Sequence, residues 1–546
     1  MARTQEDILN FVRQVYTEHK SYWEQKSGEL KRYKDSYETR FWESEEYNPT
    51  MIRVETADCF SYVEGFIASL FAKTPAVVIG PDIAATGGDA QLAQAAANRF
   101  LYNQREPLEN ASRLALIYDF SALKLIPEPS NEMLDKVRIE ALPCWEVIVD
   151  RDASDFSTSR FVGHTYYMTL VDAKETFGPK KYTAVPKKDY FDDYYGAIND
   201  PASSLKNLPD DYLYVEIVEL YDLLHDEVYY WSPSYSEGSK LLMREQIPIR
   251  TYNDNPLPNI ACLYYARCPS KPMEGLSAVA RVYDQFYEKN ILRTYWANAV
   301  RRDSRQYLYK EGAFDEEQLA KITAGIDGAM IGVDNESLEG LIKSVGVEPI
   351  SSNFDRYTNY IEQDINRGSI LAPFTRGEAS KATATEITAL AQYSASEIGK
   401  LAREKDSALE SIVRIYLRLL DLLAEDGESA VLEVEGEGRV ITPEDLDGKF
   451  RINALDQGST PLSDAIKKQN LLSLLPTLQA LGVPNEKIKE EIIRMYELPK
   501  DFLEVMEPIP AGPTPSPSAA DVANIEGGPE ANLTDAEQLA MMLGGS

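Results

Sequence analysis

The sequence predicts an α+β fold that is mostly helical and contains one very long helix. Two features of its hydrophobic periodicity support this class. Apolar residues recur at three- and four-residue steps through much of the chain, most regularly over about forty residues that follow position 383. Between residues 122 and 267 the period falls to two, which is typical of short, half-buried strands.

The long helix is predicted to begin near residue 384 and to run for about forty residues. Gly399 is the only glycine inside it, and no proline lies between Pro373 and Pro443. A continuous helix of this length spans roughly 60 Å, more than an ordinary globular domain requires, so we expect it to be the spine of a larger assembly. Its apolar face consists of Ile387, Leu390, Ala391, Ile398, Leu401, Ala402, Leu409, Ile412, Val413, Tyr416, Leu419, Leu420 and Leu423.

The first half of the chain mixes helices and strands. Residues 5–75 predict helices rich in aromatic residues, which end in a strongly periodic helix over 52–71, and the strand AVVIG follows. A further helical stretch covers 90–123. Strands are then predicted at LKLIP, VRIEAL, EVIVD, FVGHTYYM, YVEIVELYDLL and EVYYW, separated by turns rich in Pro, Asn and Asp.

The second half surrounds the long helix with shorter elements. A second long helix is predicted over 275–302 and a third over 353–369, with a small α/β insert at 303–352 between them. Two or three short strands and a helical unit over 460–510 follow the longest helix. Residues 511–546 are rich in Pro, Gly, Ser and Ala and are predicted to be disordered.

The chain is strongly acidic. Its 56 Lys and Arg residues stand against 88 Asp and Glu, which gives a formal net charge of −32. A protein that coats nucleic acid non-specifically carries the opposite sign, because cations bind the phosphates. The chain is therefore either unconnected with DNA or handles DNA without adhering to it.

Cysteine and histidine are scarce. Four cysteines without a CxxC spacing argue against a disulfide framework, and only three histidines are present, so we expect no metal site and no cofactor. The N-terminus is a charged amphipathic stretch without the apolar core of a signal peptide. No apolar run is long enough to span a bilayer, so we expect a soluble intracellular product that does not bind membranes.

Signatures of catalysis are also missing from the sequence. It contains no GxxxxGK[ST], which excludes a P-loop packaging ATPase, and no GxSxG, HExxH or Cys–His pairing. His164 follows two aspartates and could be assigned to an acid–base site, but we interpret it as a strand histidine. Paired carboxylates carry no information in so acidic a chain. We expect that the protein is not an enzyme.

The aspartate-rich segment after EVIVD resembles the start of a calcium loop. Asp150, Asp152 and Ser154 have the expected spacing, but Asp155 replaces the glycine at the sixth position and Phe161 replaces the glutamate at the twelfth. We therefore interpret this segment as a solvated turn.

Two segments resemble the portal proteins of tailed bacteriophages. In 144–178 a strand leads to an aspartate-rich turn and then to a second strand that enters a helix at Thr169. In 366–402 a broken segment enters the long helix through the step TATE at Thr383–Glu386. The order of the elements, with an α/β insert between two helices and a break before the longest one, is also similar to that of portals. The resemblance covers about residues 10–505.

The resemblance implies a division of the chain into the wing, stem, clip, tunnel loop and crown of a portal subunit that assembles as a ring. The wing would be 1–274 together with the spine helix and strands at 384–459. The assignments of the other parts are 275–302 and 353–369 for the two stem helices, 303–352 for the clip, 370–383 for the tunnel loop, 460–510 for the crown and 511–546 for a disordered tail.

The resemblance also implies residues that line a DNA channel. The tunnel loop would present Leu371, Pro373, Phe374, Arg376 and Lys381 to the channel, although the same segment could be an ordinary helix–helix loop. Channel cations at the stem and clip would be Arg301, Arg302, Arg305, Arg356 and Arg367, with Lys310 and Lys321 as further candidates. Each of these cations could instead pair with a carboxylate of a neighbouring subunit.

A portal ring, usually a dodecamer, serves in genome packaging, retention and ejection at one capsid vertex. The implied partners are double-stranded DNA, the major capsid protein, the terminase large subunit, a scaffold protein and a head–tail adaptor or tail protein. The implied location is the virion, after synthesis in the host cytoplasm. The alternatives are another virion structural protein built on long helices, such as a tail or internal component, and an acidic hydrolase.

Overall fold

The computed structural model describes residues 3–454 except 44–51, 82–87, 130, 185–189, 192–211, 236–239, 304–306, 310–313, 318–319, 321–341, 345–351, 369–383, 426 and 435–436. These residues belong to the first of two units of the chain, Met1–Pro461. The second unit, Leu462–Ser546, lies outside the described residues, and with it almost all of the predicted crown and the whole predicted tail. The fold is mixed α/β and 48% helical, so the predicted mixture of helices and strands is confirmed.

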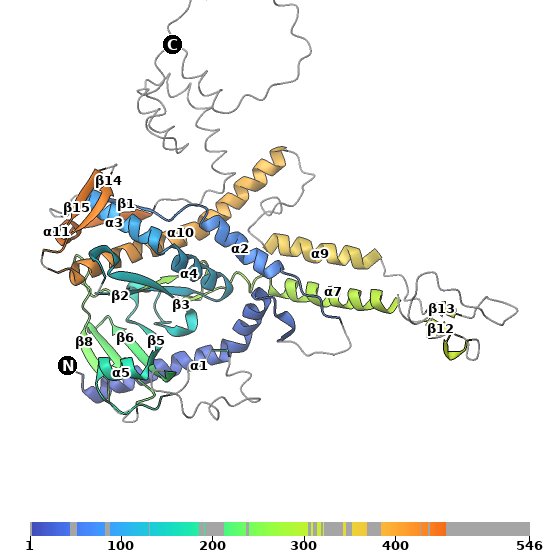
Figure 1. The fold of residues 1–546 in the computed structure, drawn as a ribbon, viewed down its shortest axis with the longest axis horizontal. Coiled ribbons are helices and arrows are strands. Elements are labelled where there is room, and N and C mark those ends of the chain that lie inside the picture. Colours follow the sequence, from blue (N-terminus) through green and yellow to red (C-terminus); the bar gives the residue numbers. More distant parts are fainter. Residues whose placement is uncertain are drawn as a thin grey trace, which may run out of the picture. The chain divides into compact units, whose positions relative to one another are not determined.

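A five-stranded antiparallel sheet lies beside the N-terminal helix (Figure 1). Helix α1, Gln5–Tyr37, begins at a capping box in which Thr4 and Asp7 bind each other's backbone N–H. The sheet has the strand order β4 (Val147–Val149), β5 (Phe161–Thr169), β6 (Tyr214–Asp222), β7 (Glu227–Trp231), β8 (Met243–Gln246).

The two faces of strand β6 are covered by different helices. Val218 and Leu220 pack against the first half of α1, while Val215 and Ile217 pack against α5, Leu170–Phe177. Successive side chains of a strand point to opposite faces, so apolar residues of β6 pack both in the cluster against α1 and in the cluster against α5. This explains why the strand is apolar at consecutive positions rather than alternately.

A three-stranded antiparallel sheet, in the order β3 (Val137–Pro143), β2 (Ser121–Pro127), β9 (Ile260–Leu263), forms the second layer. Helices α4, Arg105–Ile117, and α10, Ala384–Leu423, pack on it. The sequence predicts one helical stretch over 90–123, whereas the structure has α3, Ala90–Asn103, then α4, and β2 from Ser121. The predicted helix therefore extends too far, since α4 ends at Ile117 and β2 begins at Ser121, whose hydroxyl donates to the Ala111 carbonyl of α4 at 2.7 Å.

Helix α10 spans Ala384–Leu423 and is 40 residues long. From Ile398 to Leu420 its predicted apolar face is buried in the largest hydrophobic cluster, together with α2 (Asp58–Leu70), α3 and α4. Tyr416 stacks on Phe100 of α3 with ring centroids 3.9 Å apart. At the C-terminus of α10 the Lys136 ammonium donates to the Leu423 carbonyl at 3.1 Å. A cation at this end of a helix interacts favourably with the helix dipole. The role of α10 as the spine of a ring stays a prediction.

The other elements of the unit are short. Strand β1, Val77–Pro81, pairs with β16, Phe450–Ala454, and the hairpin β14–β15 comprises Ala430–Val434 and Glu437–Ile441. The remaining short elements are α11 (Pro443–Leu446), η1 (Phe41–Glu43), η2 (Met133–Asp135), η3 (Cys144–Glu146) and η4 (Phe156–Thr158).

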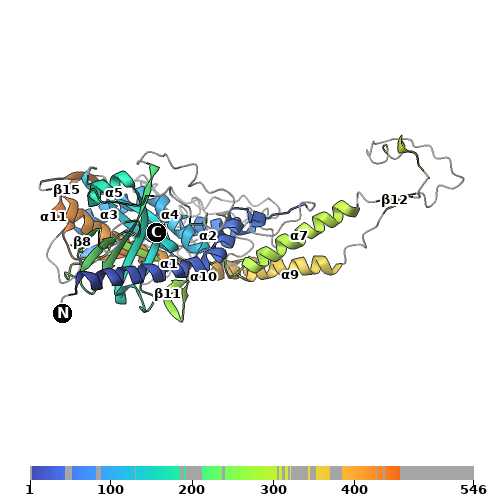
Figure 2. The same ribbon diagram turned by 90° about the horizontal axis from the view of Figure 1, so that it is seen from below.

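Two helices lie side by side and lead away from the sheets (Figures 1 and 2). These are α7, Tyr283–Asp303, and α9, Ser352–Gly368. Between them in the chain lie β12, Tyr307–Tyr309, and β13, Ile342–Ser344, which pair antiparallel. The rest of the predicted insert 303–352 is described only at a few positions.

The first of these helices starts later than predicted. The sequence predicts a helix from 275, but β10 (Arg267–Cys268) and β11 (Lys271–Gly275) form a hairpin and α7 begins at Tyr283. The connecting backbone is bound to the end of α4, because the N–H groups of Ala278 and Val279 donate to the Leu116 carbonyl at 2.9 and 3.3 Å. These contacts satisfy a helix terminus and leave residues 276–282 in a non-helical path.

Candidate functional site

The helix pair α7–α9 is the candidate functional site, and the base of α7 is fixed in the hydrophobic core. Phe286 is buried against Tyr62 of α2, Asp58–Leu70, with ring centroids 5.9 Å apart. Tyr283 packs edge-on against Tyr33 of α1 at 5.4 Å. Edge-to-face contacts of this kind hold the direction of the helix as it leaves the core.

A ladder of polar side chains binds the next three turns of α7 to residues 52–56. Asn290, Thr294 and Asn298 accept hydrogen bonds from the backbone N–H groups of Thr56 (3.0 Å), Val54 (3.0 Å) and Ile52 (2.8 Å). The Asn298 amide also donates to the Ile52 carbonyl at 2.7 Å. Four helical residues rise about 6 Å and two extended residues about 6.6 Å, so side chains at every fourth position match alternate N–H groups.

The helix predicted over 52–71 is wrong at its N-terminal end, where this ladder of hydrogen bonds holds residues 52–56. Helix α2 begins only at Asp58, because the backbone N–H groups before it are used by α7 instead of by a helix. The apolar periodicity of 52–57 is therefore not helical periodicity. The three polar residues on one face of α7 indicate in the sequence that this face has a polar partner, but they do not identify residues 52–56 as that partner.

Helix α9 is bound to α7 along an apolar seam and through charges. Ile361 and Ile365, one turn apart, are buried. Lys289 of α7 lies 2.9 Å from an Asp58 carboxylate oxygen and 3.6 Å from Glu362 of α9, so one cation joins α2, α7 and α9. The seam fixes which faces of the two helices point outward.

The outward faces carry large apolar and aromatic side chains. Tyr295 and Val300 of α7 are 55% and 53% exposed, and Tyr360 of α9 is 54% exposed. Trp296 and Tyr357 are also more than one third exposed, although the Tyr357 hydroxyl donates to Glu288. Trp296 and Val300, four residues apart, share one face of α7, whereas Tyr295 points roughly 140° away from Val300. Exposed aromatic and apolar side chains of this kind are candidates for protein contacts.

The predicted channel cations lie in part on this helix pair. Arg301 and Arg302 are in the last turn of α7 and Arg356 is exposed near the start of α9, so these three lie at the end that leads to β12–β13. Arg367 lies in the last turn of α9, at the other end. Arg305, Lys310 and Lys321 fall outside the described residues, as do Leu371, Pro373, Phe374, Arg376 and Lys381 of the predicted tunnel loop.

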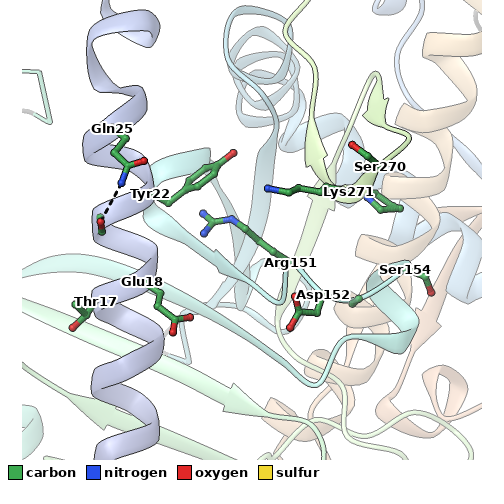
Figure 3. A pocket seen from close by; sticks show the side chains of 12 residues that line it. Thr17, Glu18, Tyr22, Gln25, Arg151, Asp152, Ser154, Ser270 and Lys271 are labelled. Carbon is green, nitrogen blue, oxygen red and sulfur yellow. Dashed lines mark hydrogen bonds between the residues drawn. The ribbon is translucent and has the colours of Figure 1, made fainter.

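A groove beside α1 is a second candidate site, which no pattern in the sequence indicates. Figure 3 shows residues of α1, of the turn after β4 and of the β10–β11 hairpin around a cavity of 910 Å³. The Arg151 guanidinium carbon lies 3.4 Å from the ring centroid of Tyr22. Burial lowers the pKa of Arg151 from its ordinary value. Three segments far apart in the chain meet here; one is the aspartate-rich turn, but no spacing in the sequence connects it to the other two.

The turn next to this groove is exposed to solvent at Asp152, Ser154 and Asp155, as the sequence predicts, but not at Asp150. Asp150 is buried, and both of its carboxylate oxygens accept hydrogen bonds from the Arg160 guanidinium, at 2.6 and 2.7 Å. Burial opposes ionisation, but the bonds from Arg160 outweigh it and hold the pKa of Asp150 below its usual value. Asp152 is exposed, and no metal-binding group of three or more His, Cys, Asp or Glu occurs among the described residues.

His164 is a buried strand histidine, as predicted. Its Nδ1 lies 3.1 Å from the Lys124 ammonium, which is 2.5 Å from Glu219. Burial, with the nearby cation of Lys124, lowers the pKa of His164 well below its usual value. The neutral ring accepts from Lys124 at Nδ1, so its proton is on Nε2, 3.8 Å from Glu146. The network joins β2 to β5 and β6 and lies apart from the groove.

The comparisons with known proteins give structural matches only. No protein-family model matches the chain, and no curated protein sequence does. A chain of the virion of a native gene transfer agent particle matches over 78% of this chain and 89% of its own length, with 13% identity and a TM-score of 0.39.

Two further solved structures come from the necks of such particles. A chain of the neck of an empty particle, with C6 symmetry, is 12% identical over 78% of this chain and 90% of its own, with a TM-score of 0.38. A chain of the neck of the native particle, with C12 symmetry, is 12% identical over 81% and 89%, with a TM-score of 0.36. All three TM-scores lie below 0.5, so the function is inferred below from the residues of this chain.

In the part of the chain that the structure covers, no helix combines the length and the apolar character that crossing a bilayer would require.

Proposed function

We propose that the chain is a portal protein, which assembles as a ring at one vertex of a viral capsid and forms a channel for double-stranded DNA. In this role it has no catalytic activity of its own. It serves the packaging, retention and ejection of the genome, and it docks the terminase motor and later an adaptor or tail. The capsid and scaffold proteins are its other partners, and it is made in the host cytoplasm before entering the virion.

The observation that carries this proposal is the set of exposed apolar side chains on α7 and α9. Tyr295, Val300 and Tyr360 are each more than half exposed, on helices whose opposite faces are already occupied by the core, by residues 52–56 and by each other. Covering each of these side chains contributes about 1 kcal/mol. Contact with the same helices of neighbouring copies, repeated around a closed ring, would cover all of them at once.

The charge of the chain agrees with a channel for a polyanion. Duplex DNA carries one negative charge per about 1.7 Å, and a basic wall would hold it. A subunit with a net charge of −32 repels DNA from most of its surface and lets it slide. A few cations, such as Arg301, Arg302 and Arg356 at one end of the helix pair, would then be enough to guide it.

Replacing Tyr295 and Val300 together by glutamate should prevent ring formation. Two carboxylates per subunit would have to be buried without partners in each contact, which costs several kcal/mol. Mass photometry of the purified variant should therefore show subunits instead of rings. Because both positions are exposed in the single subunit, its melting temperature should stay unchanged.

The matched control is Tyr102→Glu with Val431→Glu. Tyr102 of α3 and Val431 of β14 are 68% and 67% exposed and lie on other elements. Rings should persist in this control. Rings that survive the change at 295 and 300, or that are lost equally in the control, would contradict the proposed contact.

Deleting residues 371–380 should leave the ring intact but impair DNA packaging or retention. This segment, which lies outside the described residues, would supply the pliable constriction through Phe374 and Arg376. An in vitro packaging reaction with mutant particles measures the effect, and electron microscopy checks assembly. If the deletion abolishes the ring itself, the segment is a structural linker between helices.

A further inference from the structure

Arg151 is largely covered, yet its guanidinium makes no hydrogen bond to any described residue. Its side chain is 23% exposed and lies flat on Tyr22. The Glu274 carboxylate is 4.0 Å from its Nε and lies closer, at 3.2 Å, to the Lys271 ammonium. A guanidinium has five N–H donors, and covering them without acceptors is unfavourable, so the arrangement favours an added anion.

A second polar group of the same groove also lacks a partner. The Tyr22 hydroxyl is buried and makes no hydrogen bond of ordinary geometry to a described residue, although the Lys26 ammonium is near enough to oppose the rise in its pKa that burial causes. Lys26, which lies beside the Tyr22 ring, is bonded to Asp119 at 2.5 Å. In Figure 3 the side chains of Tyr22, Arg151 and Lys271 converge from three segments of the chain. A carboxylate placed between them would accept from both the hydroxyl and the guanidinium.

The shape of the groove favours an extended ligand over a compact one. A second cavity of 460 Å³ shares Glu18, Arg151 and Asp152 with the 910 Å³ cavity, so the two form one groove along α1. In the second cavity the cations are already paired, Arg3 with Asp222 at 2.8 Å and Arg160 with Asp150. Arg151, at the junction, is the cation that remains for a ligand.

We propose that this groove binds an acidic segment of a partner polypeptide, with one side-chain carboxylate on Arg151 and Tyr22. Glu18 and Asp152 on the same walls would accept from backbone N–H groups of the segment. These carboxylates would repel the successive phosphates of a nucleic acid, so a peptide fits the charges better. The inference does not depend on the proposed ring.

The test is arginine-selective labelling of the native full-length chain with phenylglyoxal, mapped by mass spectrometry. The probes are two capped peptides, Gly-Ser-Glu-Ser-Gly and the same peptide with Gln, at equal ionic strength. At about 10 mM the Glu peptide should slow the labelling of Arg151 about tenfold if its Kd is about 1 mM, because only the free site reacts. Labelling of Arg244, which is paired with Glu227 outside the groove, should not change.

The variant Arg151→Met separates binding from structure. Methionine keeps an apolar stem over Tyr22 and removes the unbonded cation, so the melting temperature should be equal to or higher than that of the wild type. The Glu peptide should raise the melting temperature of the wild type but not that of the variant. Equal effects of the two peptides, stronger protection by inorganic phosphate or by a DNA duplex, or a destabilised variant would each overturn the proposal.

Discussion

Glu219→Gln is expected to lower the free energy of unfolding by about 3–5 kcal/mol, because it leaves the Lys124 cation buried without its counter-ion. Glu219 and Lys124 are almost fully covered and lie 2.5 Å apart, between the two sheets. The substitution keeps the size of the side chain and an oxygen that can accept from Tyr221, so it removes little besides the charge. Urea unfolding followed by tryptophan fluorescence measures the loss.

The double variant Lys124→Met with Glu219→Gln is the control for this prediction. It removes both charges, and uncharged side chains of similar volume commonly replace a buried ion pair at little cost. Most of the stability lost in the single variant should therefore return. A double variant that is as unstable as Glu219→Gln would show that the loss arises from packing and not from the unpaired cation.

Gly275→Ala should cost about 3 kcal/mol or more, the upper end of what overpacking costs. A Cβ atom at this position would lie 1.6 Å from the Asp119 carbonyl oxygen and 3.2 Å from the Cβ of Phe120. Neither neighbour can yield easily, since Phe120 is buried and the Asp119 carboxylate is bonded to Lys26. A fall in the urea midpoint with an unchanged slope is the expected result.

Gly28→Ala is expected to raise the stability measured by the same urea unfolding assay. Gly28 lies in the interior of α1, and a Cβ there would meet no atom within 4 Å. Alanine should raise stability by about 0.5–1 kcal/mol, through its better helix propensity. If Gly275→Ala behaved like Gly28→Ala, the close approach of β11 to residue 119 would be wrong.

The elements that the sequence predicts well are those specified by local periodicity. The face of α10 from Ile398 to Leu420 is buried as predicted, because a 3.6-residue repeat leaves one orientation toward the core. The strands β2 to β7 also occur in the six short segments in which the sequence predicts strands. In each case the residues that determine the element are its own neighbours in the chain.

The predictions that fail depend on distant partners. Residues 52–56 look helical, but their N–H groups bind side chains of α7 that lie 234 to 246 residues away. Asp150 looks solvated, but Arg160 covers it once β4 and β5 pair. The groove around Arg151 brings together three segments that no spacing rule connects. Such contacts appear only when the chain is folded.

The measurement that tests the proposed function most directly is negative-stain electron microscopy of the purified full chain, with mass photometry of the same sample. We expect closed rings of about twelve subunits with a central hole, the usual form of a portal, because only a closed ring covers the exposed side chains of α7 and α9 in every subunit. Filaments or rods without a hole would contradict this account and would favour another structural component built on long helices.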